Sequence, residues 1–555
     1  MPFPEGMMTR DDLAHAAAVT PQAVSTWARR HHDFPAAVSN GSQALFSTQA
    51  VALWLDSRKI PRNALLSGER SGATYGTRFR SAVGLPTSGA IDEGSARQSK
   101  ERLNQELWVP LEQLLRKSSD PEVFEAVAMS LLCLRGTDSL GWTELATASA
   151  ATIQETLTHV RSRQPERLAK ATAALQDLPA TSWWCYQLVK LVSVIGSERI
   201  NPAQAFDYLL DRFAQERHSS RDEYLLPAEL ANLMVQMLGP KSGTRVHDPC
   251  CGTGSLLLAA ANQLGVDSAQ ASATMTGRAA SMRTWRMANI NIALRGIQID
   301  LGDGPPADPR EVDAGSGPFD AVLLNPPFGM RTWSTPTRRD PRSWPHGEPS
   351  PHNPAFAWLQ SALEVLAPGG RAAIVMPNLT TFARTGRERS IRRSLVDDRV
   401  VHCVVSLPNQ LFRETTVPVT LWILAHPNDS FGDEVLLIDA RSAAHRDGPT
   451  HRVLSHRGCR AILDAYRSWG RGAGKFPTTV DDVRSAAVAI AEIRERGYDL
   501  QATTYLDQHR LAPVRGRTDE QLRSLPAEMT RLDSEAQSAD AALDRHLREL
   551  ALWTR

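Results

Sequence analysis

The chain has 555 residues, a formal net charge of +1 and an ordinary apolar content of 42%, and its length implies several domains. No uninterrupted apolar run is long enough for a membrane helix, and Met1 to Glu5 lack the basic-then-apolar pattern of a signal peptide. Because the net charge is close to zero, any contact with nucleic acid must come from local basic patches.

The first 65 residues are predicted to form a separate unit. Asp11 to Ala17 and Pro21 to Arg30 have the pattern of two helices, and Thr20 is suited to cap the second. Asn40-Gly41 is a strong hairpin signal, and Ser47 precedes a third helix. This order is similar to a small winged helix-turn-helix, which would face the major groove of DNA with Gln22, Ser25, Thr26 and Arg29. A protein-interaction helix bundle is the alternative.

Two further segments precede the most informative part of the chain. Residues 66–98 are rich in Gly, Ser, Thr and Arg and show no convincing periodicity, so they are predicted to be a flexible linker. Helical patterning then runs from Lys100 to about Arg217, which predicts a helical domain over residues 99–218.

A glycine-containing turn opens a predicted α/β domain over residues 219–445. The short strand Thr244–Val246 leads into the run HDPCCGTGS (His247–Ser255), and Leu256–Ala260 reads as a helix. Glycines at a strand-to-helix turn let the backbone approach a ligand closely. The six cysteines of the chain contain no CxxC pair and no His/Cys metal spacing. We therefore predict no metal site and interpret Cys250 and Cys251 as packing residues in a reducing cytoplasm.

A second motif, Asn325-Pro326-Pro327-Phe328, follows the apolar strand Ala321–Leu324. The Asn325 side-chain oxygen and the Pro326 carbonyl can accept the two N–H bonds of a planar amine, which makes its nitrogen more nucleophilic. Proline fixes φ, so the direction of this carbonyl is set in advance, and Phe328 can stack on a flipped base. Open parallel sheets bind ligands at the carboxyl ends of their strands, so both motifs are expected at one edge.

Two segments of the predicted α/β domain are basic. The loop from Met330 to Pro354 contains Arg331 and Arg338, and the segment 384–393 contains Arg387; each patch either contacts DNA or is a solvated charged face.

Residues 446–515 are predicted as a C-terminal helical extension, with helices at Leu463–Trp469 and Val480–Arg496. Residues 516–555 have the spacing of a long amphipathic helix, which docks either on a partner or on the chain's own core.

Several segments, in the same order, resemble the modification (M) subunits of type I restriction-modification systems, within the adenine-N6 DNA methyltransferases. Besides the two motifs above, these are Glu106–Trp108, Phe206–Leu210, Tyr224–Pro227, Phe356–Gln360, Leu366–Asn378, Ser406–Pro408, Val435–Arg441, Gly497–Leu500 and Tyr505. The resemblance covers most of the chain beyond the first hundred residues, and the N-terminal unit is not standard in that family. It implies a Rossmann-like domain that depends on S-adenosylmethionine (SAM), with a helical domain before it and helices after it.

In that family the glycine turn binds SAM and the Asn-Pro-Pro-Phe loop is catalytic. The resemblance implies catalytic roles for Asn325, Pro326, Pro327 and Phe328, and cofactor contacts from Pro227, Asp248, Pro249, Gly252, Thr253, Gly254, Ser255 and Asp303. Two positions depart from the pattern: Leu226 replaces a threonine, and Ala279 replaces the acid that binds the ribose hydroxyls. Losing such a charge-assisted contact costs roughly 1.5–3 kcal/mol, or about tenfold or more in affinity.

We therefore expect a site-specific DNA methyltransferase that transfers a methyl group from SAM to N6 of a flipped adenine, in a bacterial restriction-modification or anti-phage defence system. Expected partners are double-stranded DNA and a specificity subunit or other defence proteins, with a homodimer left open, in the cytoplasm at the nucleoid. The alternatives are a DNA-sensing scaffold with weakened catalysis, a DNA-binding regulator, and a glutamine methyltransferase for release factors. Enzymes of the last kind are shorter and lack the helical domain.

Overall fold

The computed structural model describes the chain in segments. The described residues are 7–31, 34–35, 38–40, 43–56, 58, 60–61, 64, 66, 74–83, 100–118, 120–178, 181–216, 226–265, 274–304, 317–327, 344–350, 353–383, 386–412, 417–426, 432–447, 451–472, 476 and 478–506. The chain divides into two compact units, Met1–Ala502 and Thr503–Arg555. Within the described part, no helix has the length and apolar character needed to cross a membrane.

The N-terminal segment folds as the predicted helices and hairpin. Its elements are β1 (Met7–Thr9), α1 (Arg10–Ala16), α2 (Pro21–Arg30), β2 (Val38–Asn40), β3 (Gln43–Ser47) and α3 (Thr48–Asp56). The strands form an antiparallel sheet in the order β1-β3-β2. The Thr20 side chain accepts a hydrogen bond from the Ala23 N–H, and Pro21 occupies the first turn of α2, so the cap expected from the sequence is present.

Helix α4 (Tyr75–Val83) lies inside the segment predicted to be a flexible linker, so that prediction is wrong over these residues. Phe79 is fully buried in a hydrophobic cluster that also contains Leu13, Val24 and Val51. The Arg78 guanidinium donates to the Ala17 carbonyl at 3.3 Å. One aromatic residue on a basic, polar helix carries little periodic signal, which explains the error. The N-terminal unit therefore extends to Val83.

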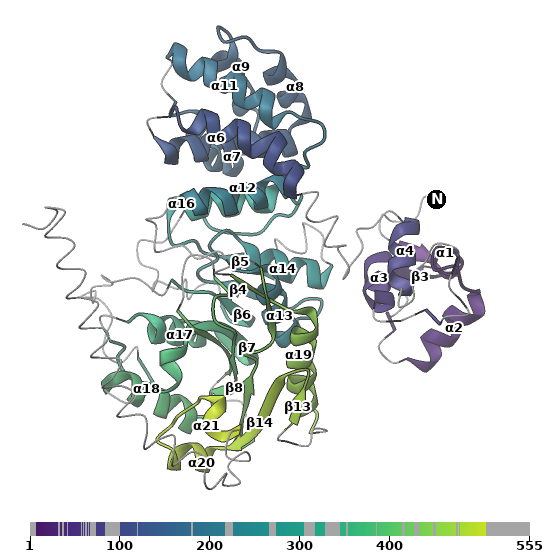
Figure 1. Ribbon diagram of the computed structural model, residues 1–555, viewed down its shortest axis with the longest axis vertical. Coiled ribbons are helices and arrows are strands. Elements are labelled where there is room, and N and C mark those ends of the chain that lie inside the picture. Colours follow the sequence, from purple (N-terminus) through teal and green to yellow (C-terminus); the bar gives the residue numbers. More distant parts are fainter. Residues whose placement is uncertain are drawn as a thin grey trace, which may run out of the picture. The chain divides into compact units, whose positions relative to one another are not determined.

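The predicted helical domain is present and is built around α7, which is buried on most of its surface. Its elements are η2 (Asn104–Trp108), α6 (Val109–Leu115), α7 (Pro121–Thr137), α8 (Ser139–Thr147), α9 (Ile153–Ser162), α10 (Glu166–Ala171), η3 (Ala173–Leu175), α11 (Ser182–Ile195) and α12 (Pro202–Glu216) (Figure 1). Asp120 caps α7 by accepting hydrogen bonds from the Glu122 and Val123 N–H groups. Helix α7 contacts α8, α11 and α12.

A nine-stranded sheet forms the centre of the α/β domain, in the order β13-β14-β10-β8-β9-β7-β6-β4-β5. The strands are β4 (Val246–Asp248), β5 (Met275–Gly277), β6 (Phe319–Leu324), β7 (Leu366–Pro377), β8 (Val401–Ser406), β9 (Val419–Ala425), β10 (Glu434–Asp439), β13 (Thr478–Val480) and β14 (Val483–Ala489). Strands β5, β4, β6 and β7 run parallel to one another, whereas β9 runs antiparallel between β7 and β8. A small separate ribbon pairs β11 (Ala444–Arg446) with β12 (Arg452–Leu454).

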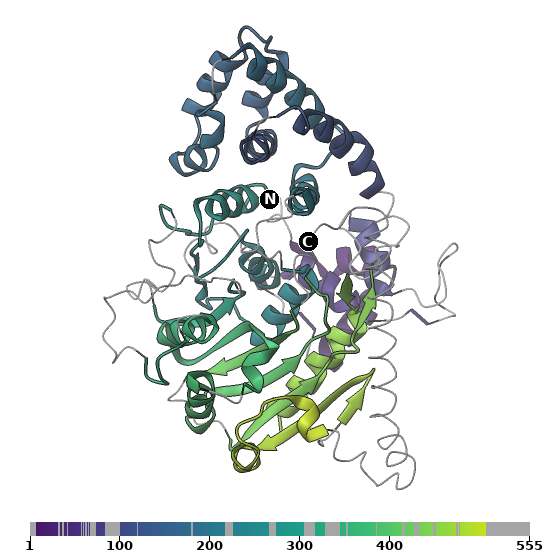
Figure 2. The ribbon, with the colours of Figure 1, turned by 60° about the vertical axis from the view of Figure 1, so that its left-hand side comes forward.

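Helices cover both faces of this sheet (Figures 1 and 2). The helices of this part of the chain are α13 (Ala228–Leu238), α14 (Ser255–Leu264), α16 (Met282–Ala293), α17 (Ala355–Glu364), η5 (Asn378–Thr381), α18 (Gly386–Asp397), α19 (His456–Gly470), α20 (Ile490–Glu495) and α21 (Ala502–Leu506). Helices α17 and α18 lie on one face, and α13 and α19 lie on the other. This arrangement is the Rossmann-like architecture that the sequence predicts.

The segment after residue 445 is not simply helical. Helix α19 contains the predicted helix Leu463–Trp469, but the predicted helix Val480–Arg496 is wrong. Its residues form β14 and then α20, and β14 pairs along its length with β10. Alanines favour a helix locally, but the unpaired edge of β10 offers backbone hydrogen bonds that override this preference. The predicted helix over 516–555 lies outside the described residues.

Candidate active site at the carboxyl edge of the sheet

The two motifs found in the sequence meet at one edge of the sheet. Strand β4 ends at Asp248 and β6 ends at Leu324, and the two strands pair in parallel, with Val246 opposite Ala321. Because parallel neighbours end at the same edge, the glycine turn and the Asn325 loop follow adjacent strands there. The predicted juxtaposition of the motifs is therefore confirmed.

The glycine turn has the backbone form expected of a ligand-binding loop. Gly252 and Gly254 have φ values of 52° and 82°, in the left-handed region that favours glycine. The Gly254 N–H donates to the Cys251 carbonyl at 2.7 Å. Gly254 is the N-cap of α14, which starts at Ser255 and buries Leu256 to Ala261 against the sheet. This turn brings the free N–H groups of a helix start to the edge of the sheet.

Asp248 is a fully buried carboxyl group at the end of β4. Its Oδ1 accepts a hydrogen bond from the Cys250 N–H at 3.0 Å. Burial raises its pKa to about 8. Among the described residues, its second oxygen, Oδ2, has no hydrogen-bond partner. A buried polar atom without a partner is costly, and a polar group of a ligand that forms a hydrogen bond with it would satisfy it. This oxygen therefore fits the predicted role of Asp248 in a cofactor pocket.

Asn325, after the adjacent strand β6, also presents a buried oxygen without a partner among the described residues. Its side-chain Oδ1 is buried and, within the described part of the chain, has no hydrogen-bond partner. Pro326 is buried and Pro327 is half-buried, so the loop after β6 is held in place by packing. The oxygen can accept a hydrogen bond from an amine substrate. Phe328 lies outside the described residues.

The other residues assigned to the cofactor pocket lie in different surroundings. Pro227 is the N-cap of α13, and Asp303 is exposed in the segment after Asp300, which bridges to Thr276 of β5. Ala279 is 1% exposed and is the second residue after β5. Leu226 packs against the hydrophobic core. The two departures from the family pattern are thus apolar contacts in the structure.

A cavity of about 540 Å³ lies next to the glycine turn. Pro227 and Ser255 are among its lining residues, whereas Asp248, Asp303 and Asn325 do not line it. Its other walls come from α12, α13, α14, α16 and the segment around β12. The cavity is thus a neighbour of the candidate active site and shares two of its residues.

The predicted DNA contacts have mixed surroundings. Gln22 and Arg29 are exposed on α2, whereas the Ser25 and Thr26 hydroxyls donate to the carbonyls of Pro21 and Gln22 in their own helix. These two hydroxyls are therefore already engaged.

On α18, Arg387 is exposed and pairs with Glu348 at 3.1 Å. Arg392, from the same basic segment, points inward. It is 1% exposed and donates to the carbonyls of Tyr498, Thr380 and Ala383. Arg392 is thus a structural residue and does not belong to a basic surface patch. Arg331 and Arg338 lie outside the described residues.

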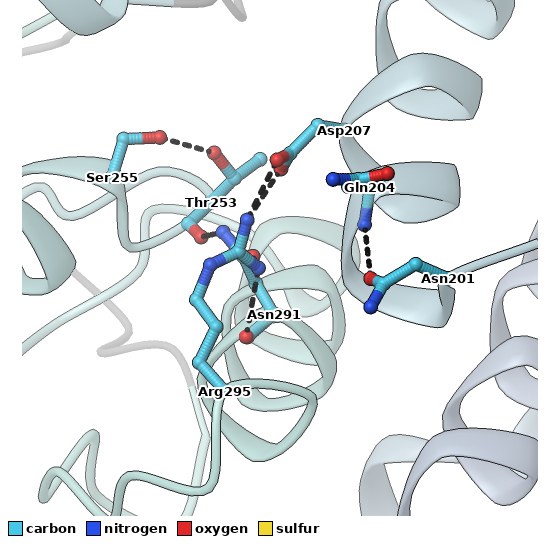
Figure 3. Close-up of polar contacts among 7 residues, drawn as sticks. All are labelled: Asn201, Gln204, Asp207, Thr253, Ser255, Asn291 and Arg295. Atoms are coloured by element: carbon cyan, nitrogen blue, oxygen red, sulfur yellow. Dashed lines mark hydrogen bonds and ion pairs between the residues drawn. The ribbon is translucent and has the colours of Figure 1, made fainter. Parts of the chain in front are cut away.

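Sequence reasoning missed one residue that contacts the glycine turn. Asn291 of α16 donates its side-chain Nδ2–H to the Thr253 carbonyl at 2.7 Å (Figure 3). The available signal was a polar residue at a buried position of an otherwise apolar helix face, next to Ala288 and Ile292. A buried amide needs a partner, but its identity follows only from the fold.

Comparison with known proteins gives a consistent result. The sequence model of the N-6 DNA Methylase family matches residues 202–512. The type I restriction enzyme HindI methylase subunit of Haemophilus influenzae is 31% identical over 277 residues, which are 48% of this chain and 60% of that protein. The MjaIX methylase subunit of Methanocaldococcus jannaschii is 26% identical over 313 residues, 54% of each chain. This chain thus spans little more than half the length of these curated relatives.

A solved structure supports the fold. The methyltransferase subunit of the type I restriction-modification system from Streptococcus thermophilus superposes with a TM-score of 0.59 at 22% identity, covering 74% of this chain and 99% of that one. The family match spans more than half of the present chain and includes the glycine turn, the Asn325 loop and the whole nine-stranded sheet. The chain belongs to the N-6 DNA methylase family.

Proposed function

We propose that this chain is a SAM-dependent methyltransferase that modifies N6 of adenine in double-stranded DNA, within a bacterial restriction-modification or anti-phage defence system. The observation that carries the proposal is the buried oxygen of Asn325, which has no hydrogen-bond partner in the described part of the chain, with a glycine turn after the adjacent strand. The similarity to methylase subunits of type I restriction enzymes supports the same activity. The family match does not favour the scaffold alternative.

Some residues at this edge would bind the cofactor, and others would bind the substrate. Gly252 and Gly254 would admit the cofactor close to the backbone, and Asp248 Oδ2 would form a hydrogen bond with it. Thr253, Ser255, Pro249, Pro227 and Asp303 complete the proposed pocket. When bound, SAM supplies a methyl group on a sulfonium, which is a good leaving group, so no covalent enzyme intermediate is needed.

The Asn325 loop would prepare the base. The Asn325 Oδ1 and the Pro326 carbonyl accept the two N–H bonds of adenine N6, which turns the nitrogen lone pair toward the methyl group. Pro327 restricts the loop, and Phe328 is proposed to stack on the flipped adenine. Flipping is required because an enzyme's active site cannot reach N6 while the base is stacked inside the duplex.

DNA and protein partners would supply affinity and sequence specificity. We propose DNA contacts from Gln22, Ser25, Thr26 and Arg29 of α2, from Arg331 and Arg338, which follow the Asn325 loop in the sequence, and from Arg387 of α18. Because the named relatives are subunits, a specificity subunit or other defence protein is the proposed partner, and a homodimer is an alternative assembly. Such a complex would act at the nucleoid in the cytoplasm.

Asn325→Ala tests the chemistry. Removing a preorganised polar group at the reacting atom costs about 10²-fold or more in rate, so methyl transfer should fall at least that far. The measurement is N6-methyladenine formed from SAM and genomic DNA, together with the partner subunit if the chain needs one. Sequencing modified adenines in cells with and without the protein would also reveal the target site.

The controls separate lost chemistry from lost folding. Asn325→Asp keeps an acceptor oxygen and should retain more activity than Asn325→Ala, and the melting temperatures of both variants should stay close to that of the wild type. Adenine methylation by Asn325→Ala at the wild-type rate would remove the proposed role of this residue.

A further inference from the structure

Asn291 fixes one peptide group of the glycine turn. Its side chain is only 3% exposed, and its Nδ2–H donates to the Thr253 carbonyl at 2.7 Å. That carbonyl belongs to the same planar peptide group as the Gly254 N–H, which donates to the Cys251 carbonyl. The peptide is therefore held from both sides, although Gly252 and Gly254 leave the backbone around it permissive.

Arg295 fixes the orientation of Asn291. The two residues are one turn apart on the same helical path, and the Arg295 Nη1 donates to both the side-chain and the main-chain oxygen of Asn291 (Figure 3). Because its amide oxygen accepts from a guanidinium, the NH₂ group of Asn291 must point toward Thr253. A hydrogen bond between an amide oxygen and a charged guanidinium is stronger than one between two neutral groups.

Asp207 connects Arg295 to the helical domain. The Arg295 Nη2 donates to both carboxylate oxygens of Asp207, at 2.8 and 2.7 Å, and Asp207 belongs to α12. An unbroken series of hydrogen bonds thus runs from the helical domain, through two side chains, to the backbone of the glycine turn (Figure 3). We call Asp207, Arg295 and Asn291 the relay.

The relay borders a cavity. All three residues line the cavity of about 540 Å³, together with Ser255 at the start of α14. The cavity leaves open space beside the relay. A shift of α12 would separate Asp207 from Arg295 and release the orientation of Asn291.

We propose that the relay makes the affinity for SAM depend on the position of the helical domain, with Asn291 and Arg295 as positioning residues for the glycine turn. This inference rests on the proposed function, because it takes the turn to be the cofactor site. Linkage requires the reciprocal effect: bound SAM would stabilise the position of α12 that keeps the relay intact. Binding of DNA or a partner to the helical domain could then raise or lower cofactor affinity.

The test compares SAM affinity among variants by calorimetry on the full chain. Asn291→Ala and Arg295→Met should each raise the SAM Kd roughly tenfold, as expected for one charge-assisted or buried hydrogen bond. Asp207→Asn should have a smaller effect, and Arg295→Lys, which keeps the charge but not the fork, should lie between Arg295→Met and the wild type. In active preparations the KM for SAM should rise while the KM for DNA is unchanged.

Glu125→Gln provides the matched control. The buried Glu125 of α7 accepts a hydrogen bond from Arg283 of the same helix α16 at 2.7 Å, two turns before Asn291. Losing this link between the helical domain and α16 should lower the melting temperature without changing the SAM Kd. Arg295→Lys and Asp207→Asn keep the test usable if Asn291→Ala fails to fold.

The outcomes are separable from those of the proposed function. If the wild-type chain and its complexes do not bind SAM, the cofactor assignment itself fails. If the wild type binds SAM and the relay variants bind it equally well, the relay is overturned while the cofactor assignment stands. If Glu125→Gln weakens SAM binding as much as Arg295→Met does, the effect is general destabilisation and the relay is again overturned.

Discussion

At the scale of single residues, Asp248 makes the apo protein sensitive to pH. Burial raises its pKa from the ordinary 3.8 to about 8, so between these values the folded state holds a proton that the unfolded chain releases. This group therefore leaves stability unaffected below about pH 4 and lowers it progressively as the pH rises toward 8. Asp248→Asn removes the titration and keeps an acceptor for the Cys250 N–H.

We expect the melting temperature of Asp248→Asn, measured without SAM, to exceed that of the wild type at pH 8 and to match it more closely at pH 5. Each kcal/mol regained corresponds to about 2–4 °C for a domain of this size. Asp303→Asn, a change at an exposed carboxylate on the same edge, is the control and should show no such trend. A constant difference between Asp248→Asn and wild type from pH 5 to 8 would contradict the assignment.

At the scale of elements, α4 decides where the N-terminal unit can be cut. Phe79 is fully buried in the cluster formed by residues of this unit, and Tyr75 contacts Trp27 edge-on at a centroid distance of 5.4 Å. Deleting residues 1–65 leaves α4 without the core that covers these rings, whereas deleting residues 1–83 removes the core and the helix together. The shorter deletion should expose apolar surface.

We therefore expect the 1–65 deletion to aggregate more and to bind a hydrophobic dye more strongly than the 1–83 deletion, in light scattering and fluorescence measurements. If α2 contacts DNA as proposed, both deletions should weaken DNA affinity to a similar extent. Equal solubility and dye binding of the two deletions would show that α4 does not depend on the N-terminal core.

At the scale of the whole molecule, the chain contains separate hydrophobic cores. One cluster joins the helical domain to the α/β domain, and another is confined to the N-terminal unit. A ligand that binds the folded state at 100 times its Kd adds about 2.7 kcal/mol to the stability of the part that binds it. Saturating SAM should therefore shift the unfolding of the helical and α/β domains and leave that of the N-terminal unit unchanged.

Differential scanning calorimetry with and without SAM can measure this difference. Asn325→Ala should keep the SAM-dependent shift, because Asn325 is assigned to the substrate and not to the cofactor. A single transition that moves as a whole with SAM would show that the cores unfold together. Loss of the shift in Asn325→Ala would show that Asn325 contributes to the cofactor pocket.

The sequence by itself determined the local features that depend on special residues. Glycines with positive φ at 252 and 254, the prolines after Asn325 and the cap at Thr20 act within a few residues of themselves, so their pattern reveals their geometry. The order of strand, glycine turn and helix was predictable for the same reason. These features were enough to predict the Rossmann-like domain and the candidate site.

Only the tertiary structure decided which distant residues meet. The contact of Asn291 with Thr253 joins residues 38 positions apart, and that of Arg295 with Asp207 joins residues 88 positions apart. Likewise, β14 is a strand because its backbone pairs with β10, and α4 is a helix because Phe79 packs into the hydrophobic core of the N-terminal unit. Such outcomes depend on long-range packing and backbone pairing, which outweigh local preferences of a few tenths of a kcal/mol per residue.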